Sequence, residues 1–78
     1  MAKLVFLGRL EDIAGSAERE VRGGALADVL AGLDSDLVAA LSGDRIRLAV
    51  NGTLVADRGA IVLGDGDELA FLPPVSGG

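Results

Sequence analysis

The sequence predicts an α+β domain in which a mixed sheet of four to five strands is covered on one face by one main helix. Three observations support this fold class. Apolar stretches near both ends of the chain are typical of central strands, one central stretch has helical periodicity, and an Asn-Gly pair separates two strand-like stretches. With 78 residues, folding buries only about 60% of the surface of the unfolded chain, so a single unit of this kind is expected.

The first two strands are expected at residues 2–8 and 17–22. The sequence AKLVFLG at 2–8 is apolar on both faces, which suits a central position in a sheet. RLEDIAGS, which follows, is predicted to be a turn with Gly15 as its pivot. AEREVR at 17–22 is polar except for Val21 and predicts the outer arm of a hairpin.

The main helix is predicted at residues 25–33, where apolar side chains recur at spacings of three and four. Gly32 and the Asp-Ser-Asp sequence at 34–36 interrupt this period. Asp34 or Ser35 can cap a second short helical turn that ends before Gly43. The apolar positions of the two segments are Leu26, Val29, Leu30, Leu33, Leu37, Val38 and Leu41.

The second half of the chain predicts a hairpin and a final strand. In RIRLAVNGTLVA at 45–56, apolar residues alternate with polar ones before Asn-Gly, a favoured two-residue turn. The GDGDE sequence predicts a tight turn, because it lacks the length and the distal Glu of a calcium loop. ELAFL at 68–72 predicts the final strand, which the two prolines after it end. This order of elements predicts the β-grasp arrangement of ubiquitin-like proteins, with the first and last strands paired centrally.

The composition limits the possible functions. A net charge of −5 and a sequence pI of about 4.4 disfavour binding to nucleic acid or membranes and favour a basic protein partner. The chain has no cysteine and no histidine, which excludes a ferredoxin, a thiolate metal site and the usual nucleophile and base pairs. We expect no bound cofactor, no metal site and no catalytic side chain. No stretch predicts a membrane span or a signal peptide, so a cytoplasmic location is expected.

The last six residues, PPVSGG at 73–78, predict a flexible tail that follows a folded domain at 1–72. Prolines favour extended backbone that projects from the body. The two terminal glycines are thin enough to enter a narrow channel. The Gly78 carboxylate is unreactive by itself, but adenylation by ATP in another protein would make it an acyl donor. A flexible end without function is the alternative.

Three stretches carry a resemblance to a known family: LVFLGRLEDIAG, RLAVNGTLV and above all LGDGDELAFLPPVSGG. Over almost its whole length, the chain resembles the small, sulfur-carrying subunit of molybdopterin synthase, a ubiquitin-like β-grasp protein. Sulfur carriers of the thiamine pathway are similar but usually lack the FLPPVSGG sequence. The glycine-rich stretch VRGGALADVLAGLDSD departs from the family, because a better helix cap is usual there.

The resemblance implies a mechanism. An adenylating enzyme similar to ubiquitin activators would use ATP and magnesium to activate the Gly78 carboxylate, and sulfur from a persulfide would replace AMP to give a thiocarboxylate. Gly77 and Gly78 would then enter the large synthase subunit, which transfers the sulfur to cyclic pyranopterin monophosphate. A heterotetramer of two small and two large subunits is expected, with the catalytic groups on the large subunit.

The period of two in the strands adds a prediction about docking. It places Leu4, Phe6, Ile46, Leu48, Val50, Leu69 and Phe71 toward the helix, and Val5, Leu7, Ala49, Ala70 and Leu72 on the opposite face. Apolar residues on a face expected to be solvated indicate an interface. The predicted contact surface comprises Leu7, Leu54, Leu72, Pro73, Pro74, Val75 and Ser76. Arg45, Arg47 and Arg58 could pair with acidic groups on the activating enzyme or simply be solvated.

Two other functions remain open at this point. One is a carrier for another thiolation pathway, such as thiamine synthesis, or a ubiquitin-like protein modifier. The other is a non-covalent β-grasp adaptor, which would keep its function without Gly77 and Gly78.

Overall fold

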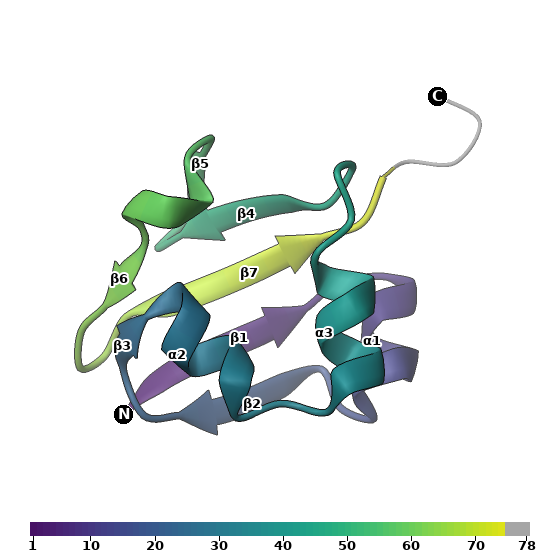
Figure 1. The fold of residues 1–78 in the computed structure, drawn as a ribbon, viewed down its shortest axis with the longest axis horizontal. Helices are drawn as coiled ribbons and strands as arrows, with labels where there is room; N and C mark the ends of the chain where they lie inside the picture. The colour runs from purple at the N-terminus through teal and green to yellow at the C-terminus, as the bar shows by residue number, and fades with distance from the viewer. Residues whose placement is uncertain (75–78) are drawn as a thin grey trace.

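The computed structural model of the chain describes residues 1–74 and contains a five-stranded mixed sheet (Figure 1). The strands lie in the order β2-β1-β7-β4-β5. Their bounds are Ala2–Phe6 for β1, Glu18–Val21 for β2, Arg47–Val50 for β4, Thr53–Val55 for β5 and Glu68–Leu72 for β7. Only the central β1–β7 pair of this sheet is parallel. The predicted α+β, β-grasp fold and its central pairing of the first and last strands are therefore confirmed.

Two short helices, α2 (Leu26–Ala31) and α3 (Ser35–Leu41), cover one face of the sheet. The expected single main helix is therefore wrong in one respect, since the helical layer consists of two helices of similar length. The break falls at the predicted place, and Asp34 is the N-cap residue of α3, although its side chain makes no capping hydrogen bond.

The stretch RLEDIAGS forms a third helix, α1 (Arg9–Ala14), so its prediction as a simple turn is wrong. The helix forms because Leu10 is buried to 1% exposure in the core, which favours a compact helical turn over an open loop. Gly15 ends α1 with φ 82°, and its N–H donates to the Glu11 carbonyl at 2.9 Å. Its role as a pivot thus becomes that of a helix C-cap.

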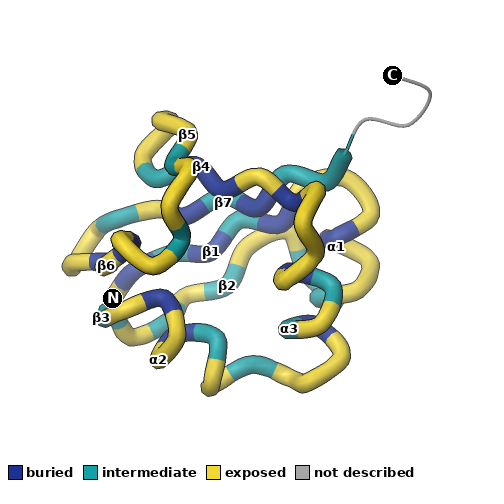
Figure 2. The backbone as a smooth tube through the Cα atoms, turned by 45° about the horizontal axis from the view of Figure 1, so that its top comes forward, coloured by how far each residue is buried: buried dark blue, intermediate teal, exposed yellow. Residues whose placement is uncertain are grey.

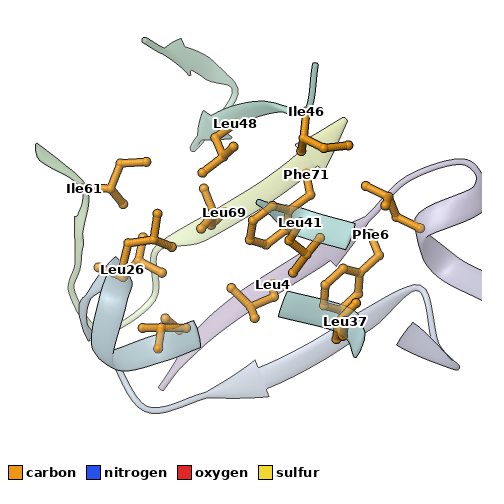
Figure 3. Close-up of a cluster of buried hydrophobic side chains, with 14 residues drawn as sticks. Leu4, Phe6, Leu26, Leu37, Leu41, Ile46, Leu48, Ile61, Leu69 and Phe71 are labelled. Atoms are coloured by element: carbon orange, nitrogen blue, oxygen red, sulfur yellow. The ribbon is translucent and has the colours of Figure 1, made fainter. Parts of the chain in front are cut away.

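The hydrophobic core lies between the sheet and the helices. The side chains of Leu4, Phe6, Leu69 and Phe71 project from the two central strands toward Leu37 and Leu41 of α3 (Figure 3). Phe6 and Phe71 are opposite each other in the register, and their rings stack at 5.7 Å between centroids. Buried positions run along β1 and β7, whereas the helices bury only one side (Figure 2). This alternation confirms which residues of the central strands face the core.

A second, two-stranded sheet pairs β3 (Gly24–Ala25) with β6 (Val62–Leu63), and the sequence did not predict it. A Cβ on Gly23 would lie 2.5 Å from the Leu63 carbonyl oxygen, so the backbones approach as closely as only glycine allows. This contact explains Gly23, one of the two glycines before the helix. A short 3₁₀ turn, η1 (Arg58–Ala60), precedes β6.

The predicted hairpin is confirmed, with β4 and β5 joined at Asn51 and Gly52. Both turn residues have positive φ, 50° and 85°, as the favoured two-residue turn requires. Asn51 also accepts a hydrogen bond from the Glu68 N–H at 3.0 Å, so the turn is fixed to the start of β7. Within residues 1–74, no helix is long and apolar enough to cross a lipid bilayer.

Candidate functional site

The candidate site is the tail root, which we define as Leu72, Pro73 and Pro74, where the chain leaves the sheet. The Leu7 N–H donates to the Phe71 carbonyl at 3.2 Å, and this bond continues the β1–β7 ladder just beyond its paired residues. Neither proline has an N–H, so β7 ends at Leu72 as predicted. The rigid centre of the sheet therefore fixes the point from which the tail departs.

Gly8 lies directly against the tail root and was given no role by the sequence. A Cβ on Gly8 would lie 2.9 Å from Cγ of Pro73. Gly8 also has φ 56° and ψ −136°, a backbone conformation that is essentially restricted to glycine. The Pro73 ring thus occupies the space that a side chain at position 8 would need, and this contact fixes where the chain leaves β7. The one available signal was a glycine between a strand and a polar stretch.

The outer face of the sheet, opposite the helices, is apolar near the tail root. The registers place Val5, Ala70, Ala49 and Leu54 in one row across four strands. Leu54 is 64% exposed and Leu7 is 41% exposed. Ala49 is buried although it lies on this face. The structure therefore places Leu7, Leu54 and Leu72 on one surface, and docking of a partner there stays a prediction.

An open groove of about 470 Å³ lies beside the tail root. Apolar and charged residues line it together: Leu54, Leu72, Pro73 and Pro74 with Asp44, Arg45 and Arg47. Leu72 of β7 and Arg47 of β4 are opposite each other in the register, so they share the outer face. The tail root is thus bordered on one side by an exposed apolar surface with two arginines.

Arg58 does not have the surface role that was considered for it. Its half-buried guanidinium donates hydrogen bonds to three backbone carbonyls, those of Leu41 at 2.8 Å, Gly43 at 3.0 Å and Ile46 at 2.7 Å. These bonds hold the end of α3 and the loop that leads to β4. This role could not be predicted from the sequence, because the acceptors lie 12 to 17 residues away from Arg58.

The GDGDE sequence forms the predicted tight turn at the far end of β7. The Gly64 N–H donates to the Asp67 carboxylate at 2.8 Å, and the Asn51 amide donates to it at 3.1 Å. These two hydrogen bonds lower the pKa of Asp67. The N-terminal ammonium group forms an ion pair with Asp65 and lowers the pKa of that carboxyl. In residues 1–74, no three acidic side chains gather as metal ligands.

The remaining predicted site residues, Val75, Ser76, Gly77 and Gly78, lie outside the described residues. Around the tail root the structure shows an apolar surface that also carries two arginines and Asp44.

Several solved structures have the same fold as this chain. The crystal structure of SAMP1 from Haloferax volcanii is 31% identical with a TM-score of 0.75, and the alignment covers 99% of this chain and 98% of that chain. The solution structure of small archaeal modifier protein 1 from Methanosarcina acetivorans is 30% identical, with a TM-score of 0.75 and coverage of 99% and 95%. CysO from Mycobacterium tuberculosis, at 19% identity, a TM-score of 0.79 and coverage of 96% and 100%, supports the fold alone.

No curated protein matches the chain. The model of the ThiS family, however, matches residues 4–78, which include both the sheet and the predicted tail. Together with the modifier proteins at 30% identity or more, this match confirms the resemblance to ubiquitin-like sulfur carriers. The chain belongs to the ThiS family and has the ubiquitin-like fold of its sulfur carriers.

Proposed function

We propose that this chain is the sulfur-carrying small subunit of molybdopterin synthase. The observation that carries the proposal is the family match, which extends through Gly78 at the end of the chain. The sequence LGDGDELAFLPPVSGG, which resembles that of molybdopterin synthase small subunits, favours this pathway over thiamine synthesis.

The chemistry takes place at the Gly78 carboxylate. An adenylating enzyme uses magnesium and ATP to convert this carboxylate to an acyl adenylate, with release of pyrophosphate. A persulfide sulfur then attacks the acyl carbon and displaces AMP, and a thiol reduces the resulting acyl disulfide to leave the thiocarboxylate. The chain contributes the carboxylate and the narrow Gly77–Gly78 end, while ATP, magnesium and the sulfur donor belong to its partners.

The outer face of the sheet is the surface by which partners hold the carrier. Leu7, Leu54 and Leu72, with Pro73 and Pro74, form an apolar surface beside the tail root. Val75 and Ser76 continue the chain from this surface toward the reactive end. The large synthase subunit binds here in a heterotetramer of two small and two large subunits, and transfers the sulfur to cyclic pyranopterin monophosphate.

The test is the intact mass of the chain after incubation with ATP, magnesium, a persulfide donor and the activating enzyme of the same organism. We expect one oxygen to be replaced by sulfur on the peptide that contains Gly78. A variant that lacks Gly78 is expected to keep its circular dichroism spectrum and to gain no sulfur. If the unaltered chain forms neither adenylate nor thiocarboxylate, the carrier function is wrong. Addition of the large subunit and cyclic pyranopterin monophosphate then tests the pathway.

A second candidate function is favoured by the similarity to small archaeal modifier protein 1. A protein modifier would use the same activated Gly78 carboxylate to acylate lysine side chains of other proteins. Digestion of cell extract and mass spectrometry distinguish the two functions. A modifier leaves a remnant of its tail on target lysines, whereas a dedicated sulfur carrier leaves none.

A further inference from the structure

Two exposed arginines, Arg45 and Arg47, lie beside the tail root. Both line the groove that Leu72 and Pro73 also line. Within residues 1–74, neither guanidinium forms a hydrogen bond or an ion pair, unlike Arg58, which binds three carbonyls. Asp44 is the only acidic residue among those that line this groove. Two arginines and one aspartate give the groove a formal charge of +1, on a chain whose net charge is −5.

The backbone that carries both arginines is held in place. Arg47 belongs to β4 and is opposite Leu72 in the sheet. Arg45 precedes β4 in a loop whose Gly43 and Ile46 carbonyls both accept hydrogen bonds from Arg58. A binding surface on rigid backbone loses less conformational entropy when a partner binds. The two arginine side chains therefore extend from fixed backbone positions beside the tail root.

The acidic residues that dominate the net charge include a group at the other end of β7. Asp65, Asp67 and Glu68 lie in or beside the turn before this strand. Leu72 lies four positions after Glu68 along the strand, roughly 13 Å away at 3.3 Å per residue. The Debye length at physiological ionic strength is about 8 Å. A partner at the tail root is therefore largely screened from these acidic residues, and the nearest charges that it meets are those of Asp44, Arg45 and Arg47.

An activating enzyme that adenylates Gly78 must come close to this groove. Gly78 is four positions after Pro74 in the sequence, and a fully extended chain spans at most about 14 Å over four positions. The tail root thus lies within that distance of the adenylation site during the reaction. The groove beside the root then faces the surface of the enzyme.

We propose that Arg45 and Arg47 bind carboxylate groups of the activating enzyme. The matching surface of that enzyme is apolar and bordered by Asp or Glu side chains. The inference rests on the proposed function, in which this enzyme holds the tail root. Guanidinium groups suit this role because they form paired hydrogen bonds with carboxylates. The local surface thereby selects a partner opposite to the basic one that the net charge alone favours.

The test compares two charge reversals, Arg47→Glu and Arg22→Glu, with Arg45→Glu as a further variant. Arg22 is also exposed but lies between β2 and β3, in a different groove. Each substitution lowers the net charge by two, from −5 to −7. We expect Arg47→Glu and Arg45→Glu each to weaken binding to the activating enzyme by about tenfold or more at low salt, because like charges then face each other. Arg22→Glu is expected to change the affinity by less than about threefold.

Salt provides an independent readout. Attraction at the groove predicts that the unaltered chain binds more weakly as salt rises, and that Arg47→Glu removes this dependence. Equal effects of Arg47→Glu and Arg22→Glu would overturn the inference, since only the net charge would then matter. Unchanged affinity in both Arg45→Glu and Arg47→Glu would overturn it as well. If the Arg45→Glu and Arg47→Glu variants are bound and adenylated as well as the unaltered chain, this inference fails but the proposed function stands. If the unaltered chain is not adenylated, the proposed function fails and this inference fails with it.

Discussion

The two ends of β7 are held by different kinds of interaction. At the turn end, residues 64–68, hydrogen bonds link Asp67 to Gly64 and Asn51, and the N-terminal ammonium group pairs with Asp65. At the tail root, residues 72–74, the strand is held by packing against Gly8 and by its neighbours in the sheet. Polar bonds thus fix the turn end, and the tail root keeps an exposed apolar surface. The proposed carrier function requires this division, because a surface that partners hold must not be covered by the chain's own polar contacts.

The largest expected effect lies between the two ends, at Phe71. Its side chain is 1% exposed and stacks on Phe6. Phe71→Ala is expected to lower the free energy of unfolding by about 3–5 kcal/mol, because it leaves a cavity in the core. Urea denaturation measures the change. Leu54→Ala, on the exposed outer face, is the control and should cost less than about 1 kcal/mol. Similar losses for the two variants would mean that the outer face is part of the folding core.

The next effect is expected at the tail root, where Gly8→Ala combines a positive φ with the contact to Pro73. We expect a loss of about 2–3 kcal/mol in unfolding free energy. Gly15→Ala is the matched control, because Gly15 also has positive φ but no atom lies within 4 Å of its added Cβ. Its cost should be about 1 kcal/mol. If Pro73 causes the difference, Gly8→Ala combined with Pro73→Ala will cost less than the sum of the single substitutions.

A smaller effect is expected at Arg58, which holds the loop beside the tail root. Arg58→Met removes the hydrogen bonds to three carbonyls and is expected to cost about 1–2 kcal/mol, because water can replace part of them. Arg45→Met serves as the control and should change the unfolding free energy by less than about 0.5 kcal/mol. Hydrogen exchange of the loop amides between α3 and β4 should rise only in Arg58→Met. Unchanged exchange there would show that the loop is held by other contacts.

The smallest effect concerns acid and the turn end. Hydrogen bonds from Gly64 and Asn51 lower the pKa of Asp67 in the folded state. A lowered folded-state pKa stabilises the protein above the ordinary pKa of aspartate, about 4, and this stabilisation is lost as the pH falls through the lower value. Unfolding free energy measured from about pH 5 downward should therefore fall less steeply in Asp67→Asn. Asp65, whose pKa is also lowered, causes part of the pH dependence to remain in this variant. The same pH dependence of the unfolding free energy in the variant and the unaltered chain would contradict the role of Asp67.

The elements that the sequence predicted correctly are those with a short-range signal. Asn51 and Gly52 define a hairpin turn by themselves, and the alternation in ELAFL with the prolines after it defines β7. Helix α1 was missed because its six residues contain too few apolar positions for a period to be evident. The β3–β6 pair has only two residues in each strand, which is too short for a recognisable alternation. It is evident only in the structure, where Gly23 also lies close to Leu63.

The candidate site divides in the same way. The parity of the strands placed Leu7, Leu54 and Leu72 on one face, because alternation is a local property. The contact of Gly8 with Pro73 joins residues far apart in the chain, and the contacts of Arg58 depend on where the loop between α3 and β4 lies. No local pattern encodes such contacts, since they exist only once the sheet has brought the segments together.

The central position of β7 has a consequence for biogenesis. Residues 68–72 supply the strand between β1 and β4, so a nascent or truncated chain that lacks them cannot close the sheet. Pairing strands this distant in sequence also makes folding slow compared with local contacts. The folded surface and the segment that follows it are therefore made available together. An activating enzyme that recognises the folded surface would therefore not bind incomplete chains that lack the tail.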